Sequence, residues 1–361
     1  MRIKMTMGDF FYGVIEGFYG RQWSWQVRKD YAAFLKQYGY DCYIYAPKGD
    51  AFLRSRWRES HDQSVLDQLA SLASCYQKHQ LRWGLGLSPL GLGEFYTAID
   101  KRQLVDKVKC LNELSPDILC ILFDDIRGDI DGLAARQLEI TADIIEASTA
   151  GQHIVCPTYY SFDPVLEQVF GPMPEGYLHQ LGAGLPAEVG VFWTGQKVIT
   201  SQYTAEEIKT VADMLCRKPV IWDNFSVNDG KQTSDHLHLQ AYTGRGHQMA
   251  QWCRGHLINP MNQPLLSQLP LQTLQAVYQQ QAGYNPMLAL KQSLASLDNS
   301  GLASLLANDI EIFQFDGLTG LSADELAEKS RLYQAVKHPV ADEVVDWLNG
   351  GYRFDPECLT G

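Results

Sequence analysis

Short apolar segments alternate with amphipathic segments along most of this chain. The first apolar segment is YGVIEG (residues 12–17), and it is followed by SWQVRKDYAAFLKQYG (24–39), where apolar side chains recur at helical spacing. A helical pattern follows most of the later apolar segments and is least clear after 153–160. The later segments are 42–47, 82–89, 118–125, 153–160, 189–195, 219–224 and 255–260. We therefore predict eight strands that alternate with helices.

This alternation predicts an α/β fold with a parallel sheet. Eight strand and helix units within residues 8–285 favour a closed (β/α)8 TIM barrel as the catalytic domain. A doubly wound open sheet is the alternative. It is disfavoured because no glycine-rich phosphate loop of the GxGxxG or GxxxxGK[ST] kind follows the first strand.

The strand pattern stops near Tyr284, and residues 286–361 have a helical pattern. Ser322 and Glu325 have the spacing of a capping box, and Pro339 interrupts a helical run that resumes in ADEVVDWLNGG (341–351). We expect a small C-terminal helical region that packs on the barrel.

Charge and hydropathy restrict the partners. The formal net charge of −12 disfavours nucleic acids and anionic membrane surfaces as partners. No apolar run approaches the ~20 residues needed to cross a bilayer. The first ten residues, MRIKMTMGDF, lack the apolar core of a signal peptide. We expect a cytoplasmic protein, unless an export signal has been removed.

Cysteine and histidine spacing gives no metal signature. The eight cysteines form no CxxC pair, and we predict that they are buried thiols in a reducing compartment. Only His236 and His238 approach a ligand spacing, and such a pair is more often incidental. We predict no metal and no cofactor.

Polar and aromatic residues follow almost every predicted strand, where the active site of a barrel lies. They include Glu16, Gly17, Tyr19, Lys48, Asp124, Asp125, Tyr160, Trp193, Trp222, Asp223, Asn224, Asp229 and Asn259. A solvated rim would favour Lys, Glu, Ser and Gly instead. Aromatic faces combined with amides and carboxylates suit a sugar ring, which has apolar faces and hydroxyls that need hydrogen-bond partners.

The segment ILCILFDD (118–125) ends on two adjacent acids, Asp124 and Asp125. Glycosidases with two catalytic carboxylates place them ~5–9 Å apart across the sugar, which neighbours on one strand do not obviously achieve. Adjacent acids suit a reaction in which the sugar's own 2-acetamido oxygen attacks the anomeric carbon. One acid then holds the acetamido N–H, and the other serves as general acid and later as general base. Repulsion between the two charges would raise one of the two pKa values.

Eight motifs resemble those of glycoside hydrolase family 84, in the same order. They are GVIEGFYGRQW, YIYAPKGD, WRES, ILFDDI, CPTYYS, VFWTGQKV, VIWDNFSVND and INP, and they span about residues 10–265. The family includes the protein O-GlcNAcases and bacterial β-N-acetylglucosaminidases. The resemblance implies exo-acting, retaining, substrate-assisted hydrolysis of terminal β-linked GlcNAc through an oxazoline, on a glycoprotein, glycopeptide or oligosaccharide.

The resemblance also implies roles for the matched residues. Asp124 would orient the acetamido group, and Asp125 would be the general acid/base. The remaining matched residues would bind the sugar: Gly17 and Lys48 at its hydroxyls, Tyr160 and Asn224 around the acetamido group and departing oxygen, Trp222 as a wall of the acetamido pocket, Asp229 at the 4- and 6-hydroxyls, and Asn259 beside it. Departures at Gly49, Tyr159 and Gln196 fall on the rim of the pocket, so they concern the group attached to the sugar.

Other interpretations remain open. Asp124, Asp125 and Asp129 could bind Mg²⁺ in a metal-dependent hydrolase. The chain could also be a non-catalytic GlcNAc-binding protein, which a chromogenic β-GlcNAc assay would decide. We interpret Glu16 as a structural hydrogen-bonding carboxylate, and Tyr19 and Trp23 as packing within a loop.

Overall fold

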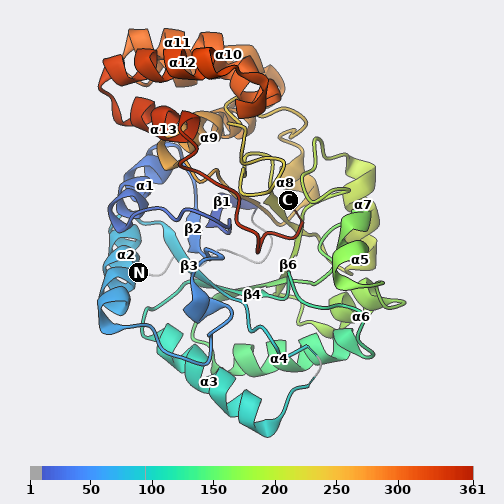
Figure 1. Ribbon diagram of the computed structural model, residues 1–361. Coiled ribbons are helices and arrows are strands. Elements are labelled where there is room, and N and C mark those ends of the chain that lie inside the picture. Colours follow the sequence, from blue (N-terminus) through green and yellow to red (C-terminus); the bar gives the residue numbers. More distant parts are fainter. Residues whose placement is uncertain (1–9, 94, 361) are drawn as a thin grey trace.

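Eight parallel strands close into a barrel in sequential order, with each strand paired to its neighbours in the chain and β8 paired back to β1 (Figure 1). The strands are β1 Phe11–Glu16, β2 Cys42–Tyr45, β3 Arg82–Leu87, β4 Ile118–Leu122, β5 Gln152–Cys156, β6 Gly190–Trp193, β7 Val220–Asp223 and β8 Gly255–Ile258. This computed structural model describes residues 10–93 and 95–360. The predicted (β/α)8 barrel is confirmed.

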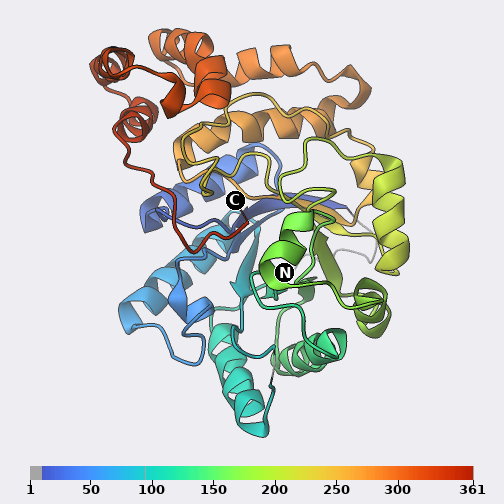
Figure 2. The ribbon, with the colours of Figure 1, turned by 45° about the vertical axis from the view of Figure 1, so that its right-hand side comes forward.

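Helices surround the barrel (Figures 1 and 2). They are α1 Trp25–Gln37, α2 Gln63–Lys78, α3 Ala98–Asn112, α4 Leu133–Ala147, α5 Pro164–Phe170, α6 Tyr177–Gly184, α7 Ala205–Met214, α8 Met249–Trp252 and α9 Pro264–Gln280. Two short helices, α5 and α6, follow β5, which explains the weak pattern there. Among the helices in the described parts of the chain, none has the length and apolar character needed to cross a membrane.

Several predicted strands extend too far. The segment 153–160 was expected to be a strand, yet β5 ends at Cys156. The next residue is Pro157, which has no N–H to donate to a ladder. The strand predicted over 118–125 ends at Leu122, so both aspartates stand beyond the sheet.

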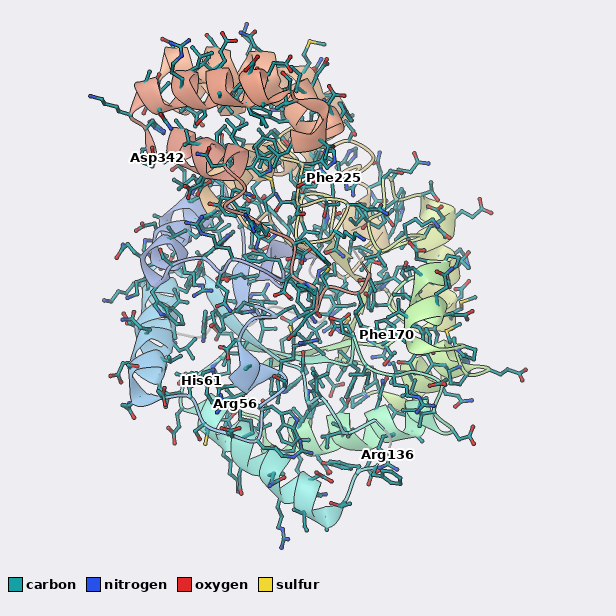
Figure 3. The ribbon with its side chains drawn as sticks, in the orientation of Figure 1. Arg56, His61, Arg136, Phe170, Phe225 and Asp342 are labelled. Atoms are coloured by element: carbon teal, nitrogen blue, oxygen red, sulfur yellow. The ribbon has the colours of Figure 1, made fainter. Side chains whose placement is uncertain are left out.

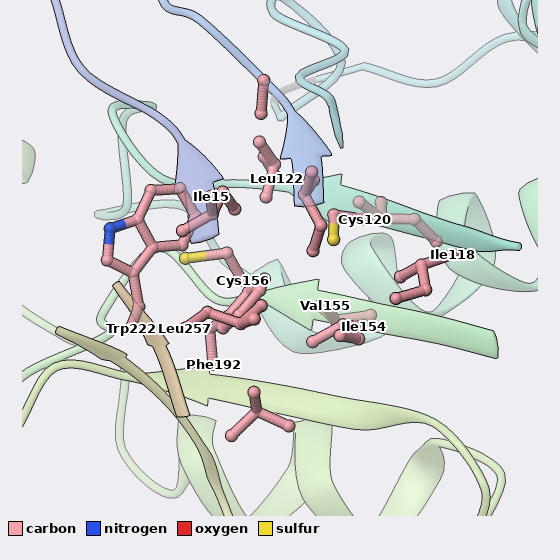
Figure 4. Packing of buried hydrophobic residues seen from close by; sticks show 14 of the residues in the cluster. Ile15, Ile118, Cys120, Leu122, Ile154, Val155, Cys156, Phe192, Trp222 and Leu257 are labelled. Carbon is pink, nitrogen blue, oxygen red and sulfur yellow. The ribbon is translucent and has the colours of Figure 1, made fainter. Parts of the chain in front are cut away.

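The interior of the barrel is filled by apolar side chains. Figure 4 shows Ile15, Cys120, Leu122, Cys156 and Leu257 converging from β1, β4, β5 and β8, and all of them are buried. Close packing of this kind makes the barrel a solid support, so the site must lie on its end.

Four helices follow the barrel: α10 Pro286–Ala295, α11 Ser300–Glu311, α12 Ala323–Val336 and α13 Pro339–Leu348. The predicted capping box of Ser322 and Glu325 is present at the start of α12. These helices share a second apolar cluster with Leu266 and Leu269 of α9, and Figure 3 shows side chains filling the space between them and the barrel.

The division at residues 285 and 286 stays a prediction. Residues 8 and 9 of the predicted barrel domain, and nearly all of the N-terminal segment tested for a signal peptide, lie outside the described residues. Beyond α13, residues 349–360 contain no helix or strand, so the helical pattern expected to the end of the chain stops at Leu348.

The cysteines partly contradict the expectation. All eight are within the described residues, and none forms a disulfide. Cys110 and Cys216 are exposed and Cys75 is half-buried, so the prediction that the cysteines are buried is wrong for these three. Cys110 lies on the outward face of α3, and Cys216 follows the end of α7.

Candidate active site

One pocket opens at the C-terminal ends of the strands, and it contains all nine predicted site residues. Its volume is about 540 Å³ with its opening to solvent included. The lining residues are Gly17, Tyr19, Lys48, Asp124, Asp125, Cys156, Tyr160, Thr194, Val198, Ile199, Trp222, Asn224, Val227, Asp229, Asn259, Cys358 and Thr360. Residues separated by more than 200 positions in the chain therefore meet around one pocket.

The two aspartates follow β4 directly. The backbone there is fixed by the segment that follows β5, because Thr158 Oγ1 donates to the carbonyl oxygen of Phe123 at 2.8 Å. Asp125 has φ of 60°, in the left-handed region that aspartate adopts more readily than most residues. Its side chain is thereby turned into the pocket beside that of Asp124.

Lys48, from the loop after β2, bridges the two carboxylates. Its Nζ donates to Asp124 Oδ2 and lies 3.2 Å from Asp125 Oδ2. All three side chains are less than a tenth exposed. The ammonium group therefore balances part of the negative charge that two neighbouring acids bring into a buried site.

Asp124 retains one unsatisfied oxygen. Its Oδ1 is buried, and among the described residues no group donates a hydrogen bond to it. Buried polar atoms are rarely left unpaired, and an exception in a pocket is a natural place for a ligand donor. An N–H group on a bound molecule would satisfy this oxygen.

The environment separates the pKa values of the two acids. Burial and the charge of Asp125 raise the pKa of Asp124, against the opposing charge of Lys48. Burial also acts to raise the pKa of Asp125, but Lys48, the Tyr19 hydroxyl and Arg54 outweigh it and lower the pKa. The expectation that one pKa is raised is met, although the raised value belongs to Asp124 and not to the expected general acid.

Amide side chains form a network on the opposite wall. The backbone N–H of Gly17 donates to Asn259 Oδ1 at 3.1 Å, and Asn259 Nδ2 donates to Asn224 Oδ1 at 3.0 Å. The indole N–H of Trp222 donates to the same Asn224 oxygen at 3.0 Å. This network holds the ends of β1, β7 and β8 together and fixes the indole ring as a wall of the pocket.

The close approach of Trp222 explains the glycine at position 17. A Cβ atom on Gly17 would lie 2.3 Å from Cζ2 of the indole, which is far inside van der Waals contact. Only glycine lets the β1 end and the indole share this wall.

Asp229 and Tyr19 are linked on the same side of the pocket. The backbone N–H of Tyr19 donates to Asp229 Oδ2 at 2.8 Å, and burial raises the pKa of Asp229 to about 6. The Tyr19 hydroxyl donates to Asp125 Oδ2 at 2.5 Å. Tyr19 therefore contacts both a pocket carboxylate and the expected acid/base, so the interpretation of Tyr19 as loop packing is wrong.

Two other acids at strand ends are structural. Glu16 is fully buried and accepts hydrogen bonds from Arg28, with Nε 2.8 Å from Oε2, and from the Tyr43 hydroxyl. This confirms the interpretation of Glu16 as a structural carboxylate. Asp223, at the end of β7, is held by Arg245 and His256 at 2.8 and 2.9 Å.

The groupings considered for metal binding are not assembled. Asp129 pairs with Arg127 at 2.5 Å and does not line the pocket, so the three aspartates of the Mg²⁺ interpretation do not converge. His236 Nδ1 lies 3.2 Å from the carbonyl oxygen of Gln314, while the His238 ring packs against Phe225. Within the described ranges, no group of three or more His, Cys, Asp or Glu side chains could hold a metal ion.

The sequence interpretation missed Arg54, Cys358 and Thr360. Arg54 Nη2 lies 3.1 Å from the Tyr19 hydroxyl, and Cys358 and Thr360 line the pocket from the far end of the chain. Tyr19 belongs to a strand-end motif and could have been found by that position. Arg54 and the two C-terminal residues lie outside any strand end, so no sequence signal pointed to them.

Comparison with known proteins agrees with this geometry. The family model described as beta-N-acetylglucosaminidase matches residues 12–311. The proteins named Protein O-GlcNAcase from Rattus norvegicus and Mus musculus are each 31% identical over 261 residues, which cover 70% of this chain and 28% of each relative. The chain thus corresponds to less than a third of these relatives.

A solved structure also matches. The chain resembles a mutant of the O-GlcNAc hydrolase of Thermobaculum terrenum with a TM-score of 0.77 and 27% identity, covering 94% of this chain and 81% of the other. The similarity therefore extends beyond the barrel into the C-terminal helices. The chain belongs to the beta-N-acetylglucosaminidase family, glycoside hydrolase family 84.

Proposed function

We propose that this protein is an exo-acting β-N-acetylglucosaminidase that cleaves terminal β-linked GlcNAc with retention, through an oxazoline formed by the substrate. The single observation that carries the proposal is the unsatisfied, buried Oδ1 of Asp124 beside Asp125. A carboxylate oxygen in this position can accept the acetamido N–H, which makes the acetamido oxygen a better nucleophile.

In the first step one bond forms at the anomeric carbon and one bond breaks there. The acetamido oxygen attacks this carbon while Asp124 accepts the N–H, and the bond to the departing oxygen breaks as Asp125 gives that oxygen its proton. In the second step Asp125 takes a proton from water. The water oxygen bonds to the anomeric carbon, and the oxazoline reopens to the acetamido group.

Lys48 accounts for the low pKa of Asp125 before substrate binds. In this structure the ammonium group of Lys48 lies 3.2 Å from Asp125 Oδ2 and favours the ionised form of that acid. We propose that bound sugar hydroxyls draw the ammonium group away. The pKa of Asp125 then rises, and the acid is protonated when the glycosidic oxygen arrives.

The remaining residues would position the sugar. Trp222 and Asn224 would enclose the acetamido group, with Tyr160 near the departing oxygen. Gly17 and Asn259 would contact hydroxyls. Asp229 is buried and would accept the 4- and 6-hydroxyls, which leaves no room for a preceding sugar and makes the reaction exo. Family membership and the names of the relatives support GlcNAc-terminated glycoproteins, glycopeptides or oligosaccharides as substrates.

The test is a series of aryl β-glycosides that differ only at C2: N-acetyl, N-fluoroacetyl, N-trifluoroacetyl, free amine and hydroxyl. Fluorination withdraws electrons from the acetamido oxygen, so kcat/KM should fall stepwise, and the amine and hydroxyl compounds should not react. Equal cleavage of the free amine would disprove the mechanism. Binding without turnover of any compound would favour the non-catalytic interpretation.

A further inference from the structure

The chain returns from the helical region to the mouth of the barrel after α13. We call residues 349–360 the strap. In Figures 1 and 2 it runs from α13 across the end of the barrel and finishes at the centre of the strand ends. Cys358 and Thr360 line the same pocket as the two aspartates.

Side-chain contacts hold the strap near its start and near its end. Near its start, Tyr352 is buried and its ring lies 4.6 Å from the guanidinium carbon of Arg21. Near its end, Glu357 Oε2 lies 2.7 Å from Nη1 of Arg54, which also contacts Tyr19. Its final turn is closed locally, with Cys358 N donating to Asp355 O at 2.9 Å. Glu357 is 68% exposed, so this second attachment is weak enough to open.

The end of the strap lies where the group attached to the sugar would leave. Thr360 Oγ1 is 3.4 Å from the Tyr160 hydroxyl, and Tyr160 is the residue proposed near the departing oxygen. Cys358 is only 8% exposed. The end of the strap therefore stands on the side of the pocket where, under the proposed function, the aglycone would leave.

We propose that the strap covers the aglycone side of the site and selects substrates by the size of the aglycone. This inference rests on the proposed function. Small aglycones fit when only the residues around Thr360 shift, whereas a polypeptide aglycone needs the whole strap to leave the mouth. The preferred substrates are therefore GlcNAc on small or flexible aglycones, and opening of the strap extends the range to polypeptides.

The first experiment compares an aryl β-GlcNAc with a GlcNAc-modified unstructured polypeptide. In Glu357→Lys, a like charge faces Arg54 and opens the strap. We expect the ratio of kcat/KM for polypeptide over aryl substrate to rise about fivefold, near the limit set by an exposed ion pair. Glu328→Lys makes the same charge change on exposed α12 and should leave the ratio unchanged. A ratio within twofold of wild type in Glu357→Lys would overturn the proposal.

The second experiment needs no turnover. Mass spectrometry of peptides after brief treatment with a thiol reagent gives a labelling rate for each cysteine. Cys358 should label much more slowly than exposed Cys110 in the wild type, and faster in Glu357→Lys. If Cys358 matches Cys110 in the wild type, the strap does not close and the proposal fails. Slow labelling of Cys358 in a protein that cleaves no glycoside would instead overturn the proposed function, and the aglycone role with it, while confirming the closed strap.

Discussion

Buried acids stand at the ends of two strands, Asp124 and Asp125 after β4 and Asp223 at the end of β7, and they differ in how many of their carboxylate oxygens are hydrogen-bonded. Asp223 accepts from Arg245 and His256 on Oδ2, and from Arg245 and the Phe225 N–H on Oδ1. At β4, Lys48 serves two carboxylates, and Asp124 Oδ1 has no donor among the described residues.

The difference distinguishes a structural carboxylate, Asp223, from the two carboxylates that we propose to be catalytic. Although burial acts to raise the pKa of Asp223, Arg245 and His256 lower it, so this acid stays ionised and acts as a fixed joint between β7, β8 and the following loop. At β4 the environment holds the two pKa values apart and leaves an acceptor open. A carboxylate that transfers protons needs a free acceptor and a shifted pKa, whereas a carboxylate that only links strands does not.

The largest expected effect is on the β4 cluster. Asp125→Asn should lower kcat/KM by about 10²–10⁴ for a poor leaving group and much less for an activated aryl group, because only protonation of the departing oxygen is lost. Asp124→Asn should be damaging for both leaving groups. Steady-state kinetics on two aryl glycosides with different leaving-group pKa values measure this. Equal losses for Asp125→Asn on both would contradict its role.

At the end of β7 we expect a substitution to lower the stability of the fold. Asp223→Ala leaves Arg245 charged and buried without its main partner, and we expect the free energy of unfolding to fall by about 3–5 kcal/mol. Urea denaturation measures it. Asp213→Asn, which breaks the exposed pair with Lys209, should cost less than about 1 kcal/mol. If Asp223→Ala lowered the free energy of unfolding as little as Asp213→Asn does, Asp223 would not have the structural role that we assign to it.

Asp229 should make sugar binding depend on pH. Burial raises its pKa to about 6, so the carboxylate that accepts hydroxyls is present above pH 6 and is lost as the pH falls through this value. We expect the Kd of free GlcNAc to rise about tenfold per pH unit below pH 6. Calorimetric titration from pH 4.5 to 8 measures it. If Asp229→Asn kept the same pH dependence, another group would be responsible.

Tyr19→Phe gives the smallest expected effect. It removes the hydroxyl that favours ionised Asp125, so the basic limb of the kcat profile, which reports the substrate complex, should move to higher pH by about 1–2 units, the size of a hydrogen bond to a charged group. Tyr96→Phe removes a similar bond, 2.8 Å from the Tyr96 hydroxyl to Asp143, outside the pocket. A profile that moved equally in both variants would exclude a specific role for Tyr19.

The sequence predicted the pocket best where its polar or aromatic residues lie at the end of a strand. Asp124, Trp222 and Asn259 all occupy such positions, and a barrel brings strand ends together whatever the intervening loops do. Polar and aromatic residues at the ends of apolar runs were therefore enough to predict where the pocket lies, although Glu16, Trp193 and Asp223 have such positions and do not line it.

Contacts between segments that are distant in the chain could not be predicted from the local pattern of apolar and polar residues. The ion pair of Arg54 with Glu357 joins positions 303 residues apart, and nothing in the local pattern of the strap distinguishes it from a helix end. The sign of the pKa shifts was equally hidden, because it depends on the position of Lys48 between the aspartates. Proline at 157 did carry a local signal for the end of β5, which the apolar pattern alone overlooked.

The left-handed backbone at Asp125 limits which replacements can be used in practice. Asparagine tolerates a φ of 60°, whereas alanine or a branched residue would add strain of about 1–2 kcal/mol. To capture an uncleaved glycoside in a crystal, Asp125→Asn is therefore the substitution to use, because it should remove the proton donor and keep the carboxylate of Asp124 in place.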